Sequence, residues 1–164
     1  MSSKLGAIQG QDAGIDIFGA FSTASLGIFS GGTLVRYNLD GKIFVSASNT
    51  ENGDVEVGML FYYRQKGNIV SAEYRGGSIV RGQLLAQVLD NGQLDMRYHH
   101  LNNKGEFMLG KCLSTPEVLP DGRLRFKESW QWLSGDMSSG YSEIEEIKGA
   151  QPAAPADAPK AARP

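Results

Sequence analysis

Residues 82–100 read GQLLAQVLDNGQLDMRYHH, and this stretch decides the fold. At its centre, Asp90-Asn91-Gly92 has the composition of a three-residue hairpin loop, with glycine at the left-handed position that such loops require. This loop pairs Val88 with Leu94. Since side chains alternate between the two faces of a strand, the even-numbered residues of both runs then share one mostly apolar face. The stretch therefore predicts an antiparallel hairpin with one buried face.

Similar turn signals recur along the middle of the chain, from Asp40-Gly41 to Gly135-Asp136, at spacings of about 9 to 17 residues. The runs between them are rich in Val, Ile, Phe, Tyr and Trp, and none shows a helical period with caps. A meander with one apolar face can bury it by closing into a barrel, which also removes the sheet edges. We expect an all-β, antiparallel, up-and-down, calycin-like barrel of about 8–9 strands, with Leu34–Asn38 as a short first strand.

The last hairpin gives an independent test of register. A three-residue loop at Ser134–Asp136 pairs Lys127 with Glu143 and Arg125 with Glu145. Opposite charges then meet across the strands, which is a favourable arrangement. The other face of the first strand is expected to point inward and carries Leu124, Phe126, Glu128, Trp130 and Trp132.

Composition divides the chain into three zones. Residues 1–33 hold seven of the 21 glycines and few charges, so we expect a low-complexity N-terminal extension. Residues 34–148 form the β-barrel domain. Residues 149–164 are rich in proline and alanine, which break helices and supply no core, so we expect a disordered tail there.

Charge and hydropathy exclude several classes of function. A net charge of −2 argues against a nucleic-acid binder, which needs a basic surface for phosphates. No run of apolar residues is long enough for a membrane-spanning helix. Asp12 and Asp16 interrupt the segment nearest to a secretory signal. We expect a cytoplasmic protein that binds neither nucleic acid nor membrane.

The sequence also lacks the usual motifs for metals, cofactors and nucleophilic catalysis. The one cysteine, Cys112, cannot form an internal disulfide. His99 and His100 point to opposite faces of a strand and cannot share a metal. No phosphate-cradling glycine loop precedes a helix, and no Gly-x-Ser-x-Gly elbow occurs. We therefore predict no metal and no cofactor, and we assign no catalytic residue.

The inward face is nevertheless not purely apolar. It carries Glu128 on one expected strand and Tyr98 with His100 on another. A two-residue turn at Gly76-Gly77 would also point Glu73 inward. The turn at Lys66-Gly67 would then point Tyr62 and Arg64 inward as well. A carboxylate in such a place must be paired, hydrogen-bonded or neutralised, because burying it alone costs several kcal/mol.

Three interpretations of this polar interior stay open. Arg64 and the interior tyrosines could satisfy the carboxylates within a packed core. The groups could instead line a ligand cavity with tryptophan walls, or Glu73 and Glu128 could act as an acid–base pair, which would require different pKa values. For the ligand cavity, the candidate binding residues are Glu73, Tyr98, His100, Glu128, Trp130 and Trp132.

Several stretches resemble one family. They include Ser48-Asn49-Thr50-Glu51-Asn52-Gly53, Ala72-Glu73-Tyr74-Arg75-Gly76-Gly77, Gly110-Lys111-Cys112, Ser114-Thr115-Pro116-Glu117, Leu119-Pro120-Asp121-Gly122-Arg123 and Trp130-Gln131-Trp132-Leu133-Ser134-Gly135-Asp136. Over about 37–147 the chain is similar to small bacterial proteins that often carry the label N-acetylglutamate synthase. The resemblance implies an acetyltransferase. The α/β acetyl-CoA-binding fold places a Gln/Arg-x-x-Gly-x-Gly/Ala signature before a helix, and this chain has neither.

The leading functional hypothesis is therefore a barrel that binds a small molecule in its interior and is not shown to be an enzyme. An N-acetylglutamate synthase-type acetyltransferase is one alternative. A structural or protein-interaction module with a packed core is another. Eight-stranded barrels can be filled by side chains or can hold one small ligand.

Overall fold

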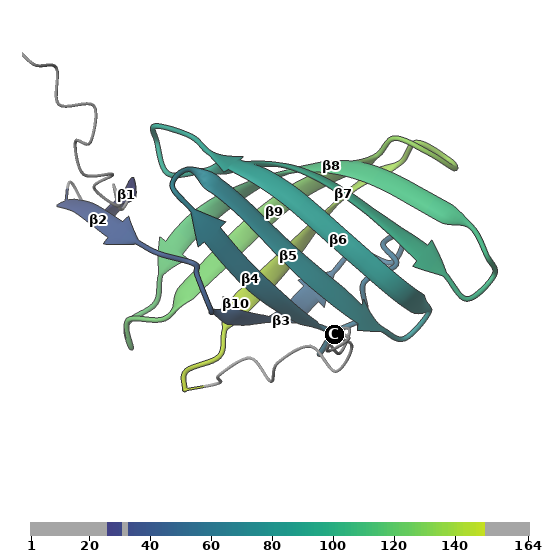
Figure 1. Ribbon diagram of the computed structural model, residues 1–164, viewed down its shortest axis with the longest axis horizontal. Helices are drawn as coiled ribbons and strands as arrows, with labels where there is room; N and C mark the ends of the chain where they lie inside the picture. Colours follow the sequence, from purple (N-terminus) through teal and green to yellow (C-terminus); the bar gives the residue numbers. More distant parts are fainter. Residues whose placement is uncertain (1–25, 31–32, 150–164) are drawn as a thin grey trace, which may run out of the picture.

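Eight antiparallel strands form a closed barrel, which Figure 1 shows from the side. The computed structural model describes residues 26–30 and 33–149, with side chains from Tyr37 onward. Each barrel strand pairs with its neighbours in sequence, and the last strand closes on the first. No helix forms in the described residues, and so none there could cross a membrane. The expected all-β meander and its closure into a barrel are confirmed.

The barrel strands are β3 (Ile43–Asn49), β4 (Leu60–Lys66), β5 (Ile69–Gly76), β6 (Ile79–Val88), β7 (Leu94–Asn102), β8 (Phe107–Val118), β9 (Leu124–Trp132) and β10 (Ser139–Glu146). A separate two-stranded sheet precedes them and consists of β1 (Leu26–Ser30) and β2 (Thr33–Tyr37).

The segment 34–38 is not a barrel strand, contrary to expectation. Most of it belongs to β2, which pairs with β1. The barrel has no place for a ninth strand, because β10 already hydrogen-bonds to β3 and leaves no free edge. The expected extension lies largely, and the expected tail almost wholly, outside the described residues. The proposed domain boundaries stay predictions.

The registers derived from three-residue loops are confirmed. Val88 pairs with Leu94 across β6 and β7, and Gly92 has the expected positive φ of 82°. At the other end of the chain, Lys127 lies opposite Glu143, and Trp130 and Trp132 are buried. The interior of β9 is therefore the face predicted from charge pairing.

The register at the β5–β6 turn differs from the expected one. Gly76 pairs with Ile79, so the turn begins one residue later than Gly76-Gly77. A β-bulge then interrupts β6 between Ile79 and Arg81 and takes up the extra residue Val80. Since a bulge breaks the alternation of side chains, Ile79 points inward and Val80 is exposed.

One end of the barrel is closed by the chain that leads into β3. Tyr37 and Leu39 are buried there against the core that includes Phe44 and Phe126. The Tyr37 hydroxyl donates a hydrogen bond to the carbonyl of Gly92 at 2.6 Å. Tyr37 and Leu39 thus form an apolar plug at this end of the barrel. Space for a cavity remains only toward the opposite end.

Candidate functional site

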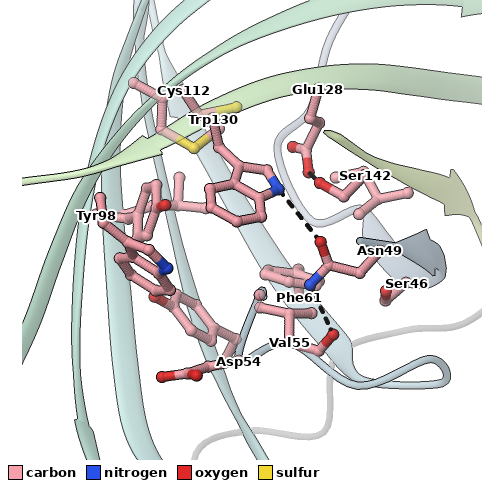
Figure 2. A pocket seen from close by; sticks show the side chains of 16 residues that line it. Ser46, Asn49, Asp54, Val55, Phe61, Tyr98, Cys112, Glu128, Trp130 and Ser142 are labelled. Carbon is pink, nitrogen blue, oxygen red and sulfur yellow. Dashed lines mark hydrogen bonds between the residues drawn. The ribbon is translucent and has the colours of Figure 1, made fainter. Parts of the chain in front are cut away.

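A small cavity lies inside the barrel, toward the end that carries the loop between β3 and β4, residues 50–59, here called the β3–β4 loop. Its volume is about 50 Å³, which is room for roughly three to five water molecules. The aromatic lining residues are Phe61, Tyr74, Tyr98, Trp130 and Trp132. The polar ones include Ser46, Asn49, Asp54, Glu128 and Ser142. Many of these side chains are shown in Figure 2.

Trp132 lies at the centre of the aromatic wall. Its ring centroid is 5.6 Å from that of Trp130 and 5.5 Å from that of Tyr98. The His100 ring meets it edge-on at 5.7 Å. Tilted and edge-to-face arrangements of this kind are favourable for aromatic rings, so the rings form one packed wall shared by β7 and β9.

Glycines on neighbouring strands make room for these rings. Gly110 lies directly across from Tyr98, and Gly140 lies across from Trp130. A Cβ atom on either glycine would overlap the facing ring. The rings can therefore lie flat against the barrel wall instead of filling its centre.

Glu128 lies in the interior between two serines from the strands on either side. Ser114 on β8 donates to Oε1 at 3.1 Å, and Ser142 on β10 donates to Oε2 at 2.8 Å. Burial raises the pKa of the Glu128 carboxyl, and these two hydrogen bonds oppose the shift. In the part of the chain that the structure describes, Glu128 makes no ion pair.

Both indole N–H groups hold the β3–β4 loop in place. Trp130 Nε1 donates to Asn49 Oδ1 at 3.2 Å, and Asn49 Nδ2 donates to the Val55 carbonyl at 2.9 Å, as Figure 2 shows. Trp132 Nε1 donates to the Asn52 carbonyl at 3.2 Å. The same tryptophans thus form the cavity wall and fix the segment that closes it.

His100 adds a third connection to this loop. Its Nε2 lies 3.1 Å from Asp54 Oδ2, and its Nδ1 lies 3.3 Å from the Tyr74 hydroxyl. Nε2 carries the proton in this network, because a carboxylate can only accept. Burial lowers the pKa of His100, while the hydrogen bond and charge of Asp54 oppose that shift. The lowered pKa favours the neutral form of this imidazole, which links the barrel to the loop.

Ser46 presents an unsatisfied group to the cavity. The residue is 1% exposed, and its Oγ has no hydrogen-bond partner in the described structure. Leaving a buried hydroxyl unpaired costs about 1–3 kcal/mol. A polar ligand atom in the cavity would remove that cost.

Of the six candidate residues, Tyr98, Glu128, Trp130 and Trp132 line the cavity. His100 is buried directly behind the wall, in contact with Tyr74 and Trp132. The expectation for Glu73 is wrong, since it is exposed and pairs with Arg81 at 3.4 Å. The cause is the bulge in β6, which shifts the pairing with β5 by one residue and places Tyr74 inward instead.

The same error affects two other expected interior residues. Tyr62 and Arg64 point outward, whereas Phe61 and Tyr63 point in. Arg64 therefore cannot neutralise Glu128. For the same reason, Glu73 cannot form an acid–base pair with Glu128. Two serine hydroxyls perform the role that was expected of a basic side chain.

Six residues of the site were not predicted from the sequence: Ser46, Asn49, Asp54, Tyr74, Ser114 and Ser142. Some signal was available, because a buried indole N–H requires an acceptor and Asn49 lies in a stretch that carried the family resemblance. Nothing in the spacing placed Asp54 beside His100.

The site offers no activated nucleophile. Burial raises the pKa of the Cys112 thiol, which keeps it protonated and poorly reactive. Burial likewise raises the pKa of the Tyr74 and Tyr98 hydroxyls. In residues 26–30 and 33–149, no three His, Cys, Asp or Glu side chains converge as metal ligands would. The arrangement is suited to binding by shape and hydrogen bonds.

A closed antiparallel barrel with a polar and aromatic interior defines a class of small, all-β barrel proteins that can hold a ligand inside. The family model described as avidin-like protein matches residues 37–147, and the chain belongs to that family. The comparison with curated proteins gave no match. The family match gives no support to the label N-acetylglutamate synthase.

Proposed function

We propose that this barrel binds one small molecule in the cavity beneath the β3–β4 loop. The observation that carries the proposal is the buried, unpartnered Ser46 hydroxyl in a cavity with aromatic walls. Ligand pockets typically combine such apolar walls with a few convergent polar groups. The avidin-like family binds small molecules such as biotin, which supports the same function here.

The cavity is smaller than the range of about 300–1,000 Å³ that is usual for ligand pockets. Gly53, Asp54 and Val55 from the β3–β4 loop form part of its lining. A ligand larger than a few atoms therefore requires this loop to move. Between Asn52 and Val55 the loop is held by individual hydrogen bonds and not by strand pairing, so displacement of this part leaves the barrel strands paired.

A module with a packed core is the second candidate, and the small cavity volume favours it. The two functions differ in what Ser46 does. In a packed core its hydroxyl only adds an unsatisfied group, so Ser46→Ala would leave stability unchanged or raised. In a binding site the same change removes a ligand contact.

The test uses the full chain and its intrinsic fluorescence. Both tryptophans of the sequence line the cavity, so their emission reports on this site. Mass spectrometry of the denatured protein would identify a co-purifying molecule, and a small-molecule library would be screened by emission and thermal shift. We expect at least one ligand, bound about fivefold to tenfold more weakly by Ser46→Ala.

Ser48→Ala is the matched control, because Ser48 lies on the same strand with an exposed side chain. It should leave affinity unchanged. The absence of any co-purifying molecule and of any hit in the library would contradict the binding function and favour the packed module.

A further inference from the structure

The charged side chains that line the cavity are all acidic. Its described lining includes two carboxylates, Asp54 and Glu128, and no lysine, arginine or histidine. The cavity therefore has no group that could neutralise a carboxylate or phosphate of a ligand. An anion placed there would also be repelled by both acids.

The two carboxylates differ in how far their hydrogen-bond acceptor sites are already used. Asp54 is already engaged by His100 Nε2 at 3.1 Å. Glu128 accepts one serine hydroxyl at each oxygen. Since a carboxylate has about four acceptor sites, Glu128 can accept two further hydrogen bonds from a ligand. Ser46 provides another unused oxygen in the same cavity.

The walls beside Glu128 favour a planar, positively charged group. Trp130 and Trp132 lie along the same interior face of β9 as Glu128, and Tyr98 completes the wall. The faces of aromatic rings attract cations, tryptophan most strongly. A guanidinium or amidinium is flat, carries several N–H donors, and pairs well with a carboxylate.

We propose that the ligand carries a guanidinium- or amidinium-like head, whose N–H groups donate to Glu128 and Ser46 while its face packs on the tryptophan wall. This inference rests on the proposed function and specifies the chemical class of the ligand. It assigns Glu128 as the residue that determines specificity for a cation. A carboxylate or phosphate elsewhere on the ligand must lie outside this cavity, whose described lining has no cationic side chain.

The test compares three probes of similar size: methylguanidinium, which is cationic, methylurea, which is neutral, and acetate, which is anionic. Binding to the full chain is measured by tryptophan emission in titrations at millimolar concentrations. We expect methylguanidinium to bind at least about tenfold more tightly than methylurea, because its hydrogen bonds to Glu128 are charge-assisted. Acetate should give no saturable change.

The variant Glu128→Gln should abolish the preference for methylguanidinium and leave the affinity for methylurea nearly unchanged. Glu73→Gln, which alters an exposed carboxylate, should retain the full preference. A pH series on the native protein and on Glu128→Gln gives a second test. Acid that protonates Glu128 should weaken methylguanidinium binding by the native protein, and Glu128→Gln should lack the part of this weakening that comes from Glu128.

Two results would overturn this inference while the binding function stands. One is tighter binding of methylurea or acetate than of methylguanidinium. The other is an unchanged preference in Glu128→Gln. Failure of all three probes would also reject the cationic head. The library screen for the proposed function then decides separately whether the barrel binds any small molecule.

Discussion

Glu128 lies in a barrel interior without a basic partner, and two hydroxyl donors make this possible. The serines come from the adjacent strands β8 and β10, at positions directly across from Glu128. Each hydroxyl satisfies one oxygen of the carboxyl group. Hydrogen bonds of this kind lower the cost of burial but do not remove it, so the carboxyl pKa stays raised.

The stability of the protein should reflect this shift. Because the folded-state pKa of Glu128 is raised, protonated Glu128 contributes fully to the free energy of unfolding below the ordinary glutamate pKa. This contribution is lost as the pH rises through the folded-state pKa. Glu128→Gln removes this pH-dependent loss of stability, because glutamine has nearly the same shape as glutamate and does not ionise. Urea unfolding should therefore show the variant gaining stability relative to the native sequence between about pH 4 and pH 8.

Glu73→Gln is the control for this measurement. The Glu73 side chain is exposed, and its ion pair with Arg81 is also exposed. We expect this change to alter the free energy of unfolding by less than about 0.5 kcal/mol at either pH. If Glu128→Gln instead lost stability as pH rose, the ionised carboxylate would have to be stabilised in the folded state.

Among the strands, β8 depends on a glycine to accommodate the aromatic wall. Gly110 pairs with Tyr98 on one side and with Trp132 on the other. Gly110→Ala would force its new methyl group against the Tyr98 ring. We expect a loss of about 1–3 kcal/mol in urea unfolding, and a shifted tryptophan emission because Tyr98 packs on Trp132.

Lys111→Ala provides the comparison, since Lys111 is the next residue of β8 and is exposed. It should change stability by less than about 0.5 kcal/mol and leave emission unaltered. Equal effects of the two substitutions would show that the Tyr98 ring can move away without cost.

The β3–β4 loop is an element that depends on polar contacts. Asp54→Ala leaves the buried N–H of His100 without an acceptor, which should cost about 1–3 kcal/mol in urea unfolding. Hydrogen exchange at the Gly53 and Gly58 amides should accelerate, because both are hydrogen-bonded within or at the end of this loop.

Asp54→Asn separates the hydrogen bond from the charge. It keeps a side-chain oxygen that can accept from His100, so most of the stability should return. If asparagine behaved like alanine, the charge of Asp54 and not its hydrogen bond would be what holds the loop.

How far the elements could be predicted from the sequence depended on their turns. The loop at Asp90-Asn91-Gly92 and the charge pairs of the last hairpin each specified a register, and both registers are confirmed. At the β5–β6 turn, two adjacent glycines permit more than one turn position, and the bulge at Val80 has no composition signal. The bulge alone exchanged Glu73 for Tyr74 in the interior, because moving a two-residue turn by one position keeps the same residues on the inner face.

The candidate site was likewise predictable only where its residues lie on regular strands. Tyr98, Glu128, Trp130 and Trp132 followed from strand alternation alone. The contribution of the β3–β4 loop could not be predicted, because a loop has no repeating pattern from which a side-chain direction follows. Asp54 reaches the site only through the path that the chain takes between two strands.

At the scale of the whole molecule, the two ends of the barrel have different roles. One end is filled by Tyr37, Leu39 and the aromatic core around Phe126. The other end holds the cavity, with hydrogen-bonded polar groups among its rings. A barrel that is packed at one end can tolerate a small cavity at the other, because most of its apolar burial does not depend on that cavity.

This division leads to a prediction about where the folded unit begins. A chain that starts at Leu34 retains Tyr37 and Leu39, and it should unfold in urea close to the full-length midpoint. A chain that starts at Asp40 lacks both side chains, which are 5% and 0% exposed in the intact protein. It should lose at least about 3 kcal/mol, as large apolar deletions in cores do.

Tyr37→Phe in the full chain isolates one part of this effect. It removes the 2.6 Å hydrogen bond to Gly92 and keeps the ring against Phe126, so it should cost only about 1 kcal/mol. Equal midpoints for the two truncated chains would mean that the plug contributes nothing and that the barrel begins at β3. A loss in the chain starting at Leu34 as large as that in the chain starting at Asp40 would instead show that the residues before 34 are needed to hold the plug in place.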